Sequence, residues 1–440
     1  MGTTSPRDIP VKQSREDDVK EKRQNRRVTK PAAKPAAAPE ETGRAVKPAP
    51  ATTAEIWVNR MIIEAVRQRA DAIHIEPRAE GLTVRFRVDG TLRPATAPEQ
   101  NLQEGVITRL KKMSMMKVED ERVPKDGRFG AIVDSREIDF RVHSLPTSYG
   151  ESLALRVLDR ATLIPMDRLG FSPAALSKVR EMMGKPRGLI LFAGPAGSGK
   201  TMTLYAVLSE IGKGDKKVVT LEYPIEFDLP NVAQSQIDPR SGYDYVTALR
   251  LVARQDPDVV MVGGLGDADT AQAALQTVLS GHLVLSSIDA NDAAEAIARL
   301  LSMGVDPLLL GNGMEGVIEQ RVLRQVCPAC KQSVAPSDAA SQWLGLKPGQ
   351  KLAKGRGCDE CNGTGYKGRV GIFAVLPVTE ELRDLMLTRP QPGALRQLYR
   401  KAEIGALYKD GADKAKAGLT TFEEVMRVAG YTLEAGGPPA

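Results

Sequence analysis

The sequence predicts an α/β protein in which a small α+β domain precedes a larger domain built on a doubly wound, mostly parallel sheet. Three observations lead to this prediction. From residue 188 onward, short apolar runs of strand length alternate with apolar residues at helical spacing, which is typical of a parallel sheet with helices on both faces. Residues 53–162 combine one helical pattern with several short strand patterns. Four cysteines form one set in the C-terminal third and predict an inserted metal site.

The N-terminal tail, residues 1–52, carries most of the net charge. The chain of 440 residues has a formal charge of +6, and its first 50 residues hold twelve Lys/Arg against seven Asp/Glu. The rest is therefore nearly neutral, and we expect no specific nucleic-acid partner. The tail is rich in proline and poor in large apolar residues, so we expect it to be disordered. It would serve as a solubilising linker or dock on anionic lipid or a partner. Residues 431–440 are expected to form a second flexible tail.

No apolar run of the chain approaches the length of about 18 residues that a membrane span requires. The N-terminus also lacks the apolar core of a signal peptide. We therefore expect a soluble, cytosolic protein.

The small domain, residues 53–162, begins with a capping box at Thr52–Glu55. One helical face is expected to carry Ile56, Ile63, Val66 and Ala70. Ile73–Ile75 predicts a strand stopped by Pro77, and Leu82–Val88 alternates as a half-buried strand closed by Asp89-Gly90. Two further strands are expected near 123–128 and 138–142. Leu163–Met183 then connects this domain to the larger one.

The larger domain, residues 163–430, is organised around the stretch Gly188–Thr201. An apolar run of strand length is followed by the pattern G-x-x-x-x-G-K-T and then by helical spacing. The residues of this loop are Gly194, Pro195, Ala196, Gly197, Ser198, Gly199, Lys200 and Thr201. In such a P-loop, glycines let backbone N–H groups surround a phosphate, and the helix N-terminus supplies partial positive charge.

Lys200 is expected to reach the β- and γ-phosphates, and the Thr201 hydroxyl to bind Mg²⁺. The alternative, a glycine-rich turn followed by Lys-Thr by chance, is disfavoured by the flanking strand and helix. We therefore expect the chain to bind ATP with Mg²⁺. Further strands are expected at 218–222, 258–262 and 283–287, and the nucleotide should lie at the carboxyl ends of the strands.

The cysteines Cys327, Cys330, Cys358 and Cys361 form two C-x-x-C pairs separated by 27 residues. This spacing is typical of a tetrahedral Cys₄ zinc site. A redox pair or disulfides are the alternatives, and a reducing cytosol disfavours both. We expect a zinc subdomain at about 325–372 and helices from Thr379 to about 430, the last capped by Thr420.

Ordered blocks from about residue 53 to 430 resemble the secretion ATPases of type II secretion and type IV pilus assembly. In the larger domain these are the "Asp box" Thr220–Glu226, the Walker B block Arg254–Gly263, the "His box" Ser280–Ser287 with Asn291-Asp292, and Gln320-Arg321 with Arg324. In the small domain they are Ala72–Pro77, Val84–Gly90, Asp126–Arg128, Asp139–Val142, Leu145–Thr147 and Tyr149–Glu151. The four cysteines match an insertion of the assembly ATPases.

The resemblance implies a RecA-like P-loop NTPase domain in a hexameric ring of identical or paralogous ATPase subunits. It implies a cytoplasmic protein that associates peripherally with the inner membrane through platform proteins. It also implies that Glu222 lies near the metal, that His282 belongs to the catalytic machinery, and that four arginines face the nucleotide. These are Arg85, Arg87, Arg128 and Arg141; the alternative is that they are ordinary surface residues of strands.

The chain departs from this family where hydrolysis chemistry is expected. Gly264 stands at the position of the Walker B glutamate that polarises water, and Gly266 replaces an arginine. Tyr223 replaces the second Asp-box acid, and Asp289 replaces the later histidine of the His box. We therefore expect a subunit that binds ATP but hydrolyses it weakly, as a regulatory or partner subunit of the ring. The alternative is an active motor in which another acid, such as Asp267 or Asp269, replaces the glutamate.

Overall fold

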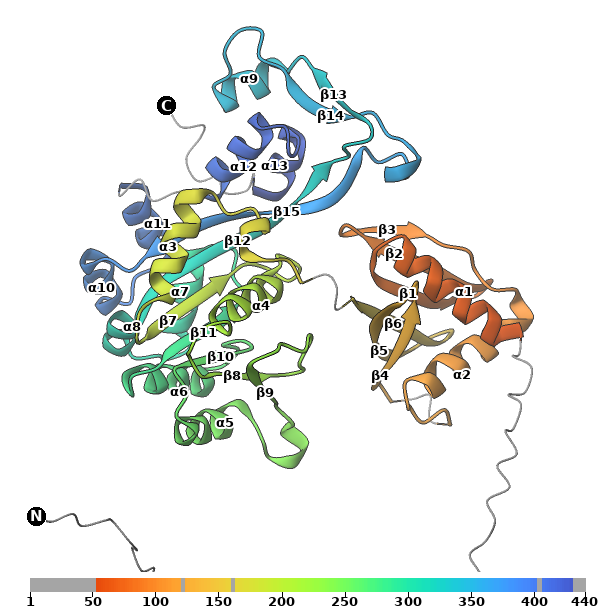
Figure 1. The fold of residues 1–440 in the computed structure, drawn as a ribbon, viewed down its shortest axis with the longest axis horizontal. Helices are drawn as coiled ribbons and strands as arrows, with labels where there is room; N and C mark the ends of the chain where they lie inside the picture. The colour runs from red at the N-terminus through yellow and green to blue at the C-terminus, as the bar shows by residue number, and fades with distance from the viewer. Residues whose placement is uncertain (1–52, 120–122, 160–162, 402–405, 430–440) are drawn as a thin grey trace, which may run out of the picture. The chain divides into compact units, whose positions relative to one another are not determined.

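The computed structural model describes residues 53–119, 123–159, 163–401 and 406–429 (Figure 1). The tails predicted at 1–52 and 431–440 lie outside the described residues, as does Thr52 of the predicted capping box. In the part of the chain that is described, no helix is both long and apolar enough to cross a membrane.

The first sheet is formed by residues 70–159. Its six strands are all antiparallel and follow the order β3-β2-β1-β6-β5-β4. The strands are β1 (Ala70–Arg78), β2 (Gly81–Val88), β3 (Thr91–Pro94), β4 (Lys125–Val133), β5 (Arg136–Thr147) and β6 (Gly150–Asp159). Helices α1 (Thr53–Arg67) and α2 (Gln103–Met113) share one apolar core with this sheet (Figure 1). This confirms the predicted α+β organisation.

Two details of this region differ from the prediction. Helix α1 buries Val58, Met61, Ile62, Ala65 and Val66, whereas Ile56 and Ile63 are 58% and 37% exposed. The buried face is therefore rotated from the predicted one, and Ala70 already belongs to β1. Strand β1 also continues through Pro77 to Arg78. Strand β6 pairs with β1 only at residues 72–75, so on that side no ladder hydrogen bond needs the N–H that proline lacks.

The second sheet has seven strands in the order β15-β12-β7-β11-β10-β8-β9. Neighbouring strands are parallel except for β15, which is antiparallel to β12. The strands are β7 (Gly188–Ala193), β8 (Val218–Glu222), β9 (Val232–Gln236), β10 (Val259–Val262), β11 (Leu283–Ile288), β12 (Met314–Val326) and β15 (Tyr366–Pro377). The predicted mostly parallel sheet is confirmed, and β9, β12 and β15 were not predicted.

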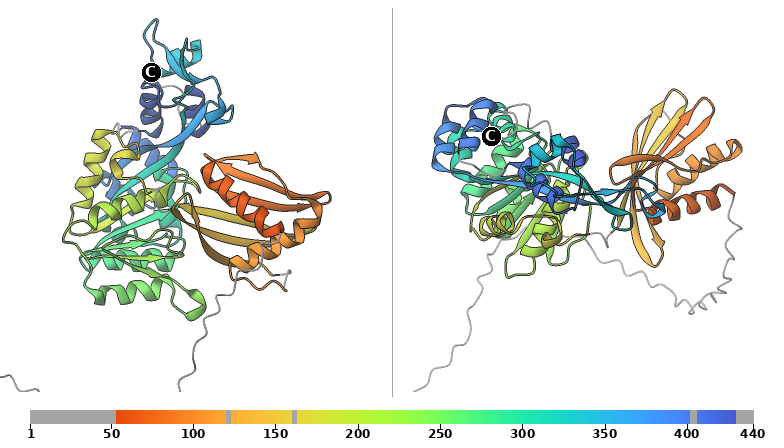
Figure 2. Two further views of the ribbon diagram at one scale, coloured as in Figure 1. Left: turned by 45° about the vertical axis from the view of Figure 1, so that its right-hand side comes forward. Right: turned by 90° about the horizontal axis from the view of Figure 1, so that it is seen from above.

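Helices cover both faces of the second sheet (Figure 2). Strand β7 shows this division, because Ile190 and Phe192 belong to a core with α3 and α4, whereas Leu189 and Leu191 belong to the core on the other face. The helices are α3 (Pro173–Met183), α4 (Lys200–Ile211), α5 (Tyr245–Val252), α6 (Ala268–Leu279), α7 (Ala293–Ser302), α8 (Pro307–Gly313), α10 (Glu380–Leu387), α11 (Pro392–Lys401), α12 (Leu407–Lys416) and α13 (Phe422–Ala429). The doubly wound prediction is confirmed.

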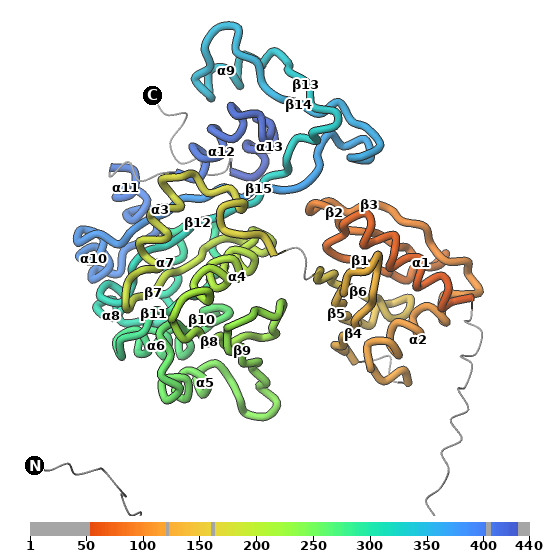
Figure 3. The backbone as a smooth tube through the Cα atoms, in the orientation of Figure 1, coloured from red at the N-terminus to blue at the C-terminus, as the bar shows by residue number. Residues whose placement is uncertain are grey.

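The cysteine region is an insertion between β12 and β15 (Figure 3). It contains a two-stranded sheet of β13 (Lys331–Val334) and β14 (Leu352–Gly355) and the helix α9 (Asp338–Leu344). The prediction that Thr420 caps the last helix is wrong by one residue. The hydroxyl of Thr421 accepts the hydrogen bond from the N–H of Glu424 (3.2 Å), while the hydroxyl of Thr420 donates to the carbonyl oxygen of Arg324 (2.8 Å).

Candidate nucleotide-binding site and metal centre

The phosphate-binding loop connects the end of β7 to the start of α4, as the sequence predicts. Strand β7 is buried along its length, so the loop starts from a fixed position at the carboxyl edge of the sheet. The residue before α4 is Gly199, whose φ of 86° lies in the left-handed region that favours glycine. Helix α4 then directs its N-terminus, with its unpaired N–H groups, at this loop.

A side chain of strand β12 is hydrogen-bonded to the loop and helps to hold it in place. The side-chain amide of Gln320 donates to the carbonyl oxygen of Ser198 (2.7 Å). At Gly194, a Cβ atom would lie 2.7 Å from the carbonyl oxygen of Gln320 and 2.4 Å from the hydroxyl oxygen of Ser198. Gly194 is therefore required for this close approach. Sequence reasoning noticed Gln320 only as part of a family block, because nothing local shows that a residue 122 positions later contacts the loop.

The Lys200 ammonium group lies inside the loop. Its Nζ donates to the carbonyl oxygens of Gly194 (2.9 Å) and Pro195 (3.0 Å) and to Oδ1 of Asp289 (2.7 Å). The Lys200 side chain is 11% exposed and that of Asp289 is 66% exposed. Asp289 directly follows β11, the neighbour of β7, so the structure brings an acidic side chain from a neighbouring strand to the P-loop lysine.

The end of β10 carries no acidic side chain next to the loop. Gly263 and Gly264 follow this strand, and the hydroxyl of Ser287 donates to the carbonyl oxygen of Gly263 (2.8 Å). A Cβ on Gly263 would lie 2.8 Å from the hydroxyl oxygen of Tyr245. At Gly264 the nearest atoms would be those of Ser287 at 3.6 Å, which is ordinary contact. Packing against Tyr245 therefore explains Gly263, whereas a Cβ at Gly264 would make only ordinary contacts.

The two acids considered as replacements lie in the first turn of α6. Both carboxylate oxygens of Asp267 accept hydrogen bonds from Thr270, one from its N–H (2.8 Å) and one from its hydroxyl (2.8 Å). Asp267 is thus the N-cap of α6. Asp269 is exposed in the same turn. Both oxygens of the Asp267 carboxylate are therefore engaged in capping α6.

Glu222 ends β8 and is buried, with 3% exposure. Its carboxylate accepts hydrogen bonds from the hydroxyls of Tyr205 and Thr220 and from the side-chain amide of Gln234. Burial and the adjacent Glu222 raise the pKa of Tyr205, so the phenol remains a donor. These contacts hold Glu222 inside the domain, and its expected place near a metal stays a prediction.

His282 lies at the opposite end of the strands from the P-loop. It precedes β11, and its carbonyl oxygen accepts from the N–H of Gly188, the first residue of β7 (3.3 Å). Its Nδ1 lies 2.9 Å from the carbonyl oxygen of Thr277. Because β7 and β11 are parallel, the loop follows their other end. The structure therefore does not bring His282 to the P-loop of the same chain.

The four arginines of the first sheet have different surroundings. Arg141 donates to the carbonyl oxygen of Ile225, in the loop after β8. Burial lowers the pKa of Arg141, and the nearby Glu226 opposes this shift. Arg85 donates to Glu76 (2.6 Å), and Arg87 donates to the carbonyl oxygen of Gly90 (3.0 Å). Arg128 is exposed and faces Arg141 across the β4–β5 pair. The structure thus joins Arg141 to the Asp-box loop.

The four cysteine sulfurs lie within 4.8 Å of one another. The Sγ–Sγ distances are 3.9 Å for Cys327–Cys358, 3.8 Å for Cys330–Cys361 and 3.7 Å for Cys358–Cys361. All four are free thiols, so the structure does not form the alternative disulfides. Sulfur atoms at these separations can surround one ion tetrahedrally, and a set of four thiolates is compatible with zinc.

Backbone groups around Cys361 favour the thiolate form of this residue, whereas burial raises the pKa of the Cys330 thiol to about 11. Burial opposes ionisation of Cys361, but N–H groups of Cys358 and Gly365 donate to its sulfur (both 3.2 Å) and lower the pKa of this thiol to about 6. Gly365 must be a glycine for this approach, because a Cβ on it would lie 2.6 Å from the carbonyl oxygen of Gly355. The donors around Cys361 therefore fit a metal ligand.

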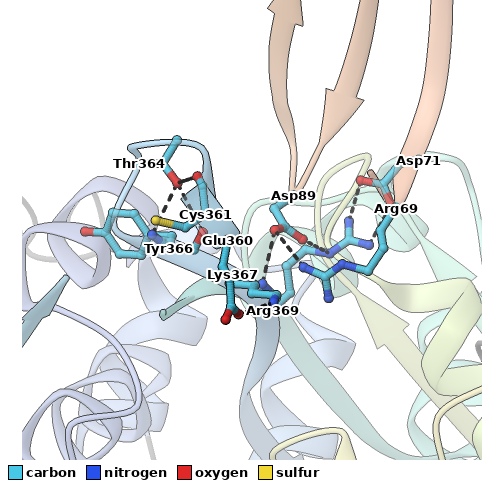
Figure 4. Close-up of polar contacts among 10 residues, drawn as sticks. Arg69, Asp71, Asp89, Glu360, Cys361, Thr364, Tyr366, Lys367 and Arg369 are labelled. Atoms are coloured by element: carbon cyan, nitrogen blue, oxygen red, sulfur yellow. Dashed lines mark hydrogen bonds and ion pairs between the residues drawn. The ribbon is translucent and has the colours of Figure 1, made fainter. Parts of the chain in front are cut away.

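Charged residues join the segment after the second cysteine pair to the first sheet (Figure 4). The guanidinium of Arg369 donates to both carboxylate oxygens of Asp71 in the first sheet (2.6 and 3.0 Å). Within the segment itself, Lys367 pairs with Glu360 (2.6 Å). Asp89, in the turn after β2, accepts from the N–H of Gly368 (3.1 Å). Partly exposed ion pairs of this kind contribute about 0–1 kcal/mol each.

Comparisons with known proteins agree with this arrangement. The family model described as Type II/IV secretion system protein matches residues 49–427. Type II secretion system protein E of Aeromonas hydrophila is 40% identical over 374 residues, which cover 84% of this chain and 74% of that protein. The type IV pilus assembly ATPase PilB of Thermus thermophilus is 39% identical over 380 residues, which cover 85% of this chain but only 43% of that protein.

A solved structure shows the same fold. The ATPase DotB of Legionella pneumophila superposes with a TM-score of 0.62 at 20% identity, covering 84% of this chain and 95% of that one. The P-loop between β7 and α4, the parallel sheet and the sequence matches over most of the chain point to one conclusion. The chain belongs to the family of type II/IV secretion system proteins.

Proposed function

We propose that this chain is an ATP-binding subunit of a type II secretion or type IV pilus assembly machinery. The observation that carries the proposal is the P-loop, in which Lys200 lies inside a loop held by β7, α4 and β12. Lys200 and Thr201 would hold the phosphates and Mg²⁺. Arg85, Arg87, Arg128 and Arg141 stay candidates for contacts to the nucleotide, and Arg141 is supported by its hydrogen bond to the Asp-box loop.

We further propose that hydrolysis is weak. The position after β10 where a glutamate would polarise water is Gly264, although a Cβ there would make only ordinary contacts. Asp267 is engaged as a helix cap. Water positioning by a general base is worth about 10²- to 10⁴-fold in rate. Without it, a chain that retains its P-loop would sense ATP and act as a regulatory or partner subunit.

The second candidate function is an active motor that drives assembly of a pilus or pseudopilus. The relatives favour it, because the Thermus thermophilus protein is named an assembly ATPase and is 39% identical. In this case another acid would position the water, and Asp289 is the carboxylate next to Lys200. The rate of phosphate release separates the two candidates.

Both candidates place the chain in the same setting. We propose a hexameric ring with identical or paralogous subunits, on the cytoplasmic side of the inner membrane and in contact with platform proteins. We also propose that Cys327, Cys330, Cys358 and Cys361 bind one zinc ion, which the separations of their sulfurs support. Structural zinc sites of this type stabilise the fold around them.

Nucleotide binding is tested by thermal unfolding with and without Mg²⁺ and ATP. A ligand that binds only the folded protein raises the melting temperature by mass action. We expect ATP to stabilise the wild-type protein and Lys200→Ala to lose most of the shift. Lys213→Ala, an exposed position just after the other end of α4, should keep it. Equal shifts in wild type and Lys200→Ala would show that the P-loop is not the binding site.

A further inference from the structure

The hydrogen-bonding capacity of Lys200 is fully used within the chain. A lysine ammonium group has three donors. Here they are directed at the carbonyl oxygens of Gly194 and Pro195 and at the carboxylate of Asp289. The two carbonyl groups belong to the P-loop itself. The carboxylate is thus the partner from outside the loop and the one with a full negative charge.

The backbone around Asp289 is held at the edge of the P-loop. The N–H of Gly194, the first residue of the loop, donates to the carbonyl oxygen of Ile288 (3.4 Å). The guanidinium of Arg299 donates to the carbonyl oxygen of Asp289 (2.6 Å). Arg321, a buried residue of β12, donates to the carbonyl oxygen of Asn291. These contacts fix the backbone on both sides of Asp289, so its ion pair with Lys200 does not depend on a mobile surface loop.

A carboxylate and a phosphate bind the Lys200 ammonium group in the same way. Both are anions that accept charge-assisted hydrogen bonds from an ammonium group. A phosphate that takes the third donor of Lys200 must displace the Asp289 carboxylate or lie beside it with like charge. Repulsion between the two anions would oppose nucleotide binding, although solvent weakens it because the Asp289 side chain is 66% exposed. Either arrangement weakens nucleotide binding.

We propose that Asp289 determines the nucleotide affinity of this site, because its carboxylate competes with nucleotide phosphate for the ammonium group of Lys200. The inference rests on the proposed ATP-binding function and adds an internal competitor to it. The apparent affinity of a ligand is its intrinsic affinity multiplied by the fraction of protein in which the site is free. A carboxylate that occupies the site part of the time therefore lowers the apparent affinity. Given the modest strength of partly exposed ion pairs, removal of the carboxylate should tighten binding about two- to fivefold.

The test compares dissociation constants for fluorescently labelled ATP with Mg²⁺ in four full-length proteins. These are wild type, Asp289→Asn, the control Asp384→Asn and Lys200→Ala. Asp384 is an exposed residue of α10, so its substitution makes the same change of net charge elsewhere. We expect about two- to fivefold tighter binding for Asp289→Asn, no change for Asp384→Asn, and loss of binding for Lys200→Ala. Asp289→Ala should behave as Asp289→Asn does.

A second readout separates competition from simple repulsion of the nucleotide. If Asp289 pairs with Lys200, then Asp289→Asn loses that pair and should lower the melting temperature without nucleotide by about 1–2 °C. Repulsion without pairing would leave that temperature unchanged or raise it. Unchanged or weaker affinity of Asp289→Asn, or tighter affinity without the loss of stability, would overturn the inference. Wild-type affinity in Lys200→Ala would instead overturn the proposed function itself.

Discussion

Glu319 is a carboxylic acid in the interior of the larger domain. It directly precedes Gln320, whose side chain is hydrogen-bonded to the P-loop. It lies on β12 and is 7% exposed. Burial, and then the nearby Asp292, raise its pKa to about 7, while Arg321 and Arg396 act in the opposite direction. The phenol of Tyr399 also lies close enough to be affected by it. Glu319 therefore keeps its proton in the folded protein at a pH where an exposed glutamate has lost it.

Stability should consequently fall between about pH 4.5 and 7. In this window the unfolded chain releases a proton that folded Glu319 keeps, so each rise in pH favours unfolding, and the effect levels off above pH 7. The difference from the ordinary value of 4.5 corresponds to a free energy on the order of 3 kcal/mol.

Glu319→Gln removes this contribution. The melting temperature of the variant minus that of the wild type should therefore be larger at pH 8 than at pH 5. The measurement is a pair of melting curves for each protein at these two pH values. A constant difference between the two proteins would contradict the buried, protonated state of Glu319.

Elements with strong local signals were predictable, and those defined by distant contacts were not. Strands β7, β8, β10 and β11 are short apolar runs between helical patterns, and all four form. Strand β12 contains Glu319, Gln320, Arg321 and Arg324 among its apolar residues, so its sequence does not read as a buried strand. Two of these polar side chains have partners elsewhere in the chain, Gln320 at Ser198 and Arg324 at Glu424. The cap of α13 was misassigned for the same reason, because the hydroxyl of Thr420 is used by β12.

The cysteine insertion is the element whose stability depends most clearly on a ligand. Its two C-x-x-C turns lie at the ends of β12 and β15, and the apolar cluster around them consists of the cysteines themselves. We expect the purified, reduced protein to contain about one zinc ion per chain by elemental analysis. Cys358→Ser should reduce the zinc content and destabilise the insertion, because metal binding and folding are linked.

A chelator should destabilise the wild-type protein and have little further effect on Cys358→Ser. Limited proteolysis between β12 and β15 reports on the insertion directly. The zinc assignment fails if freshly prepared, reduced wild-type protein contains no metal.

At the scale of the whole molecule, the sequence predicted the site's components better than their arrangement. The P-loop and the four cysteines follow from local spacing, and the structure groups each set as expected. The contact of Asp289 with Lys200 depends on the adjacency of β7 and β11, which no local pattern shows. The same topology explains His282, since it enters β11 at the end away from the loop.

The balance between ATP binding and hydrolysis is the central claim about the whole molecule. A chain with an intact P-loop and Gly264 after β10 should bind ATP and turn it over slowly, even when assembled. Gly264→Glu is the variant that tests this, because a Cβ at position 264 would make only ordinary contacts, with Ser287 at 3.6 Å. It need not restore the rate alone, because Tyr223, Gly266 and Asp289 also differ and catalytic groups that act together are not additive.

The most direct test is steady-state phosphate release by the purified, assembled protein with Mg²⁺ and ATP. Lys200→Ala serves as the control for contaminating ATPases, and ATP binding is measured on the same samples. We expect phosphate release at the level of the Lys200→Ala control together with clear ATP binding by the wild type. A rate of about several per second that disappears in Lys200→Ala would contradict it and would establish the chain as an active motor.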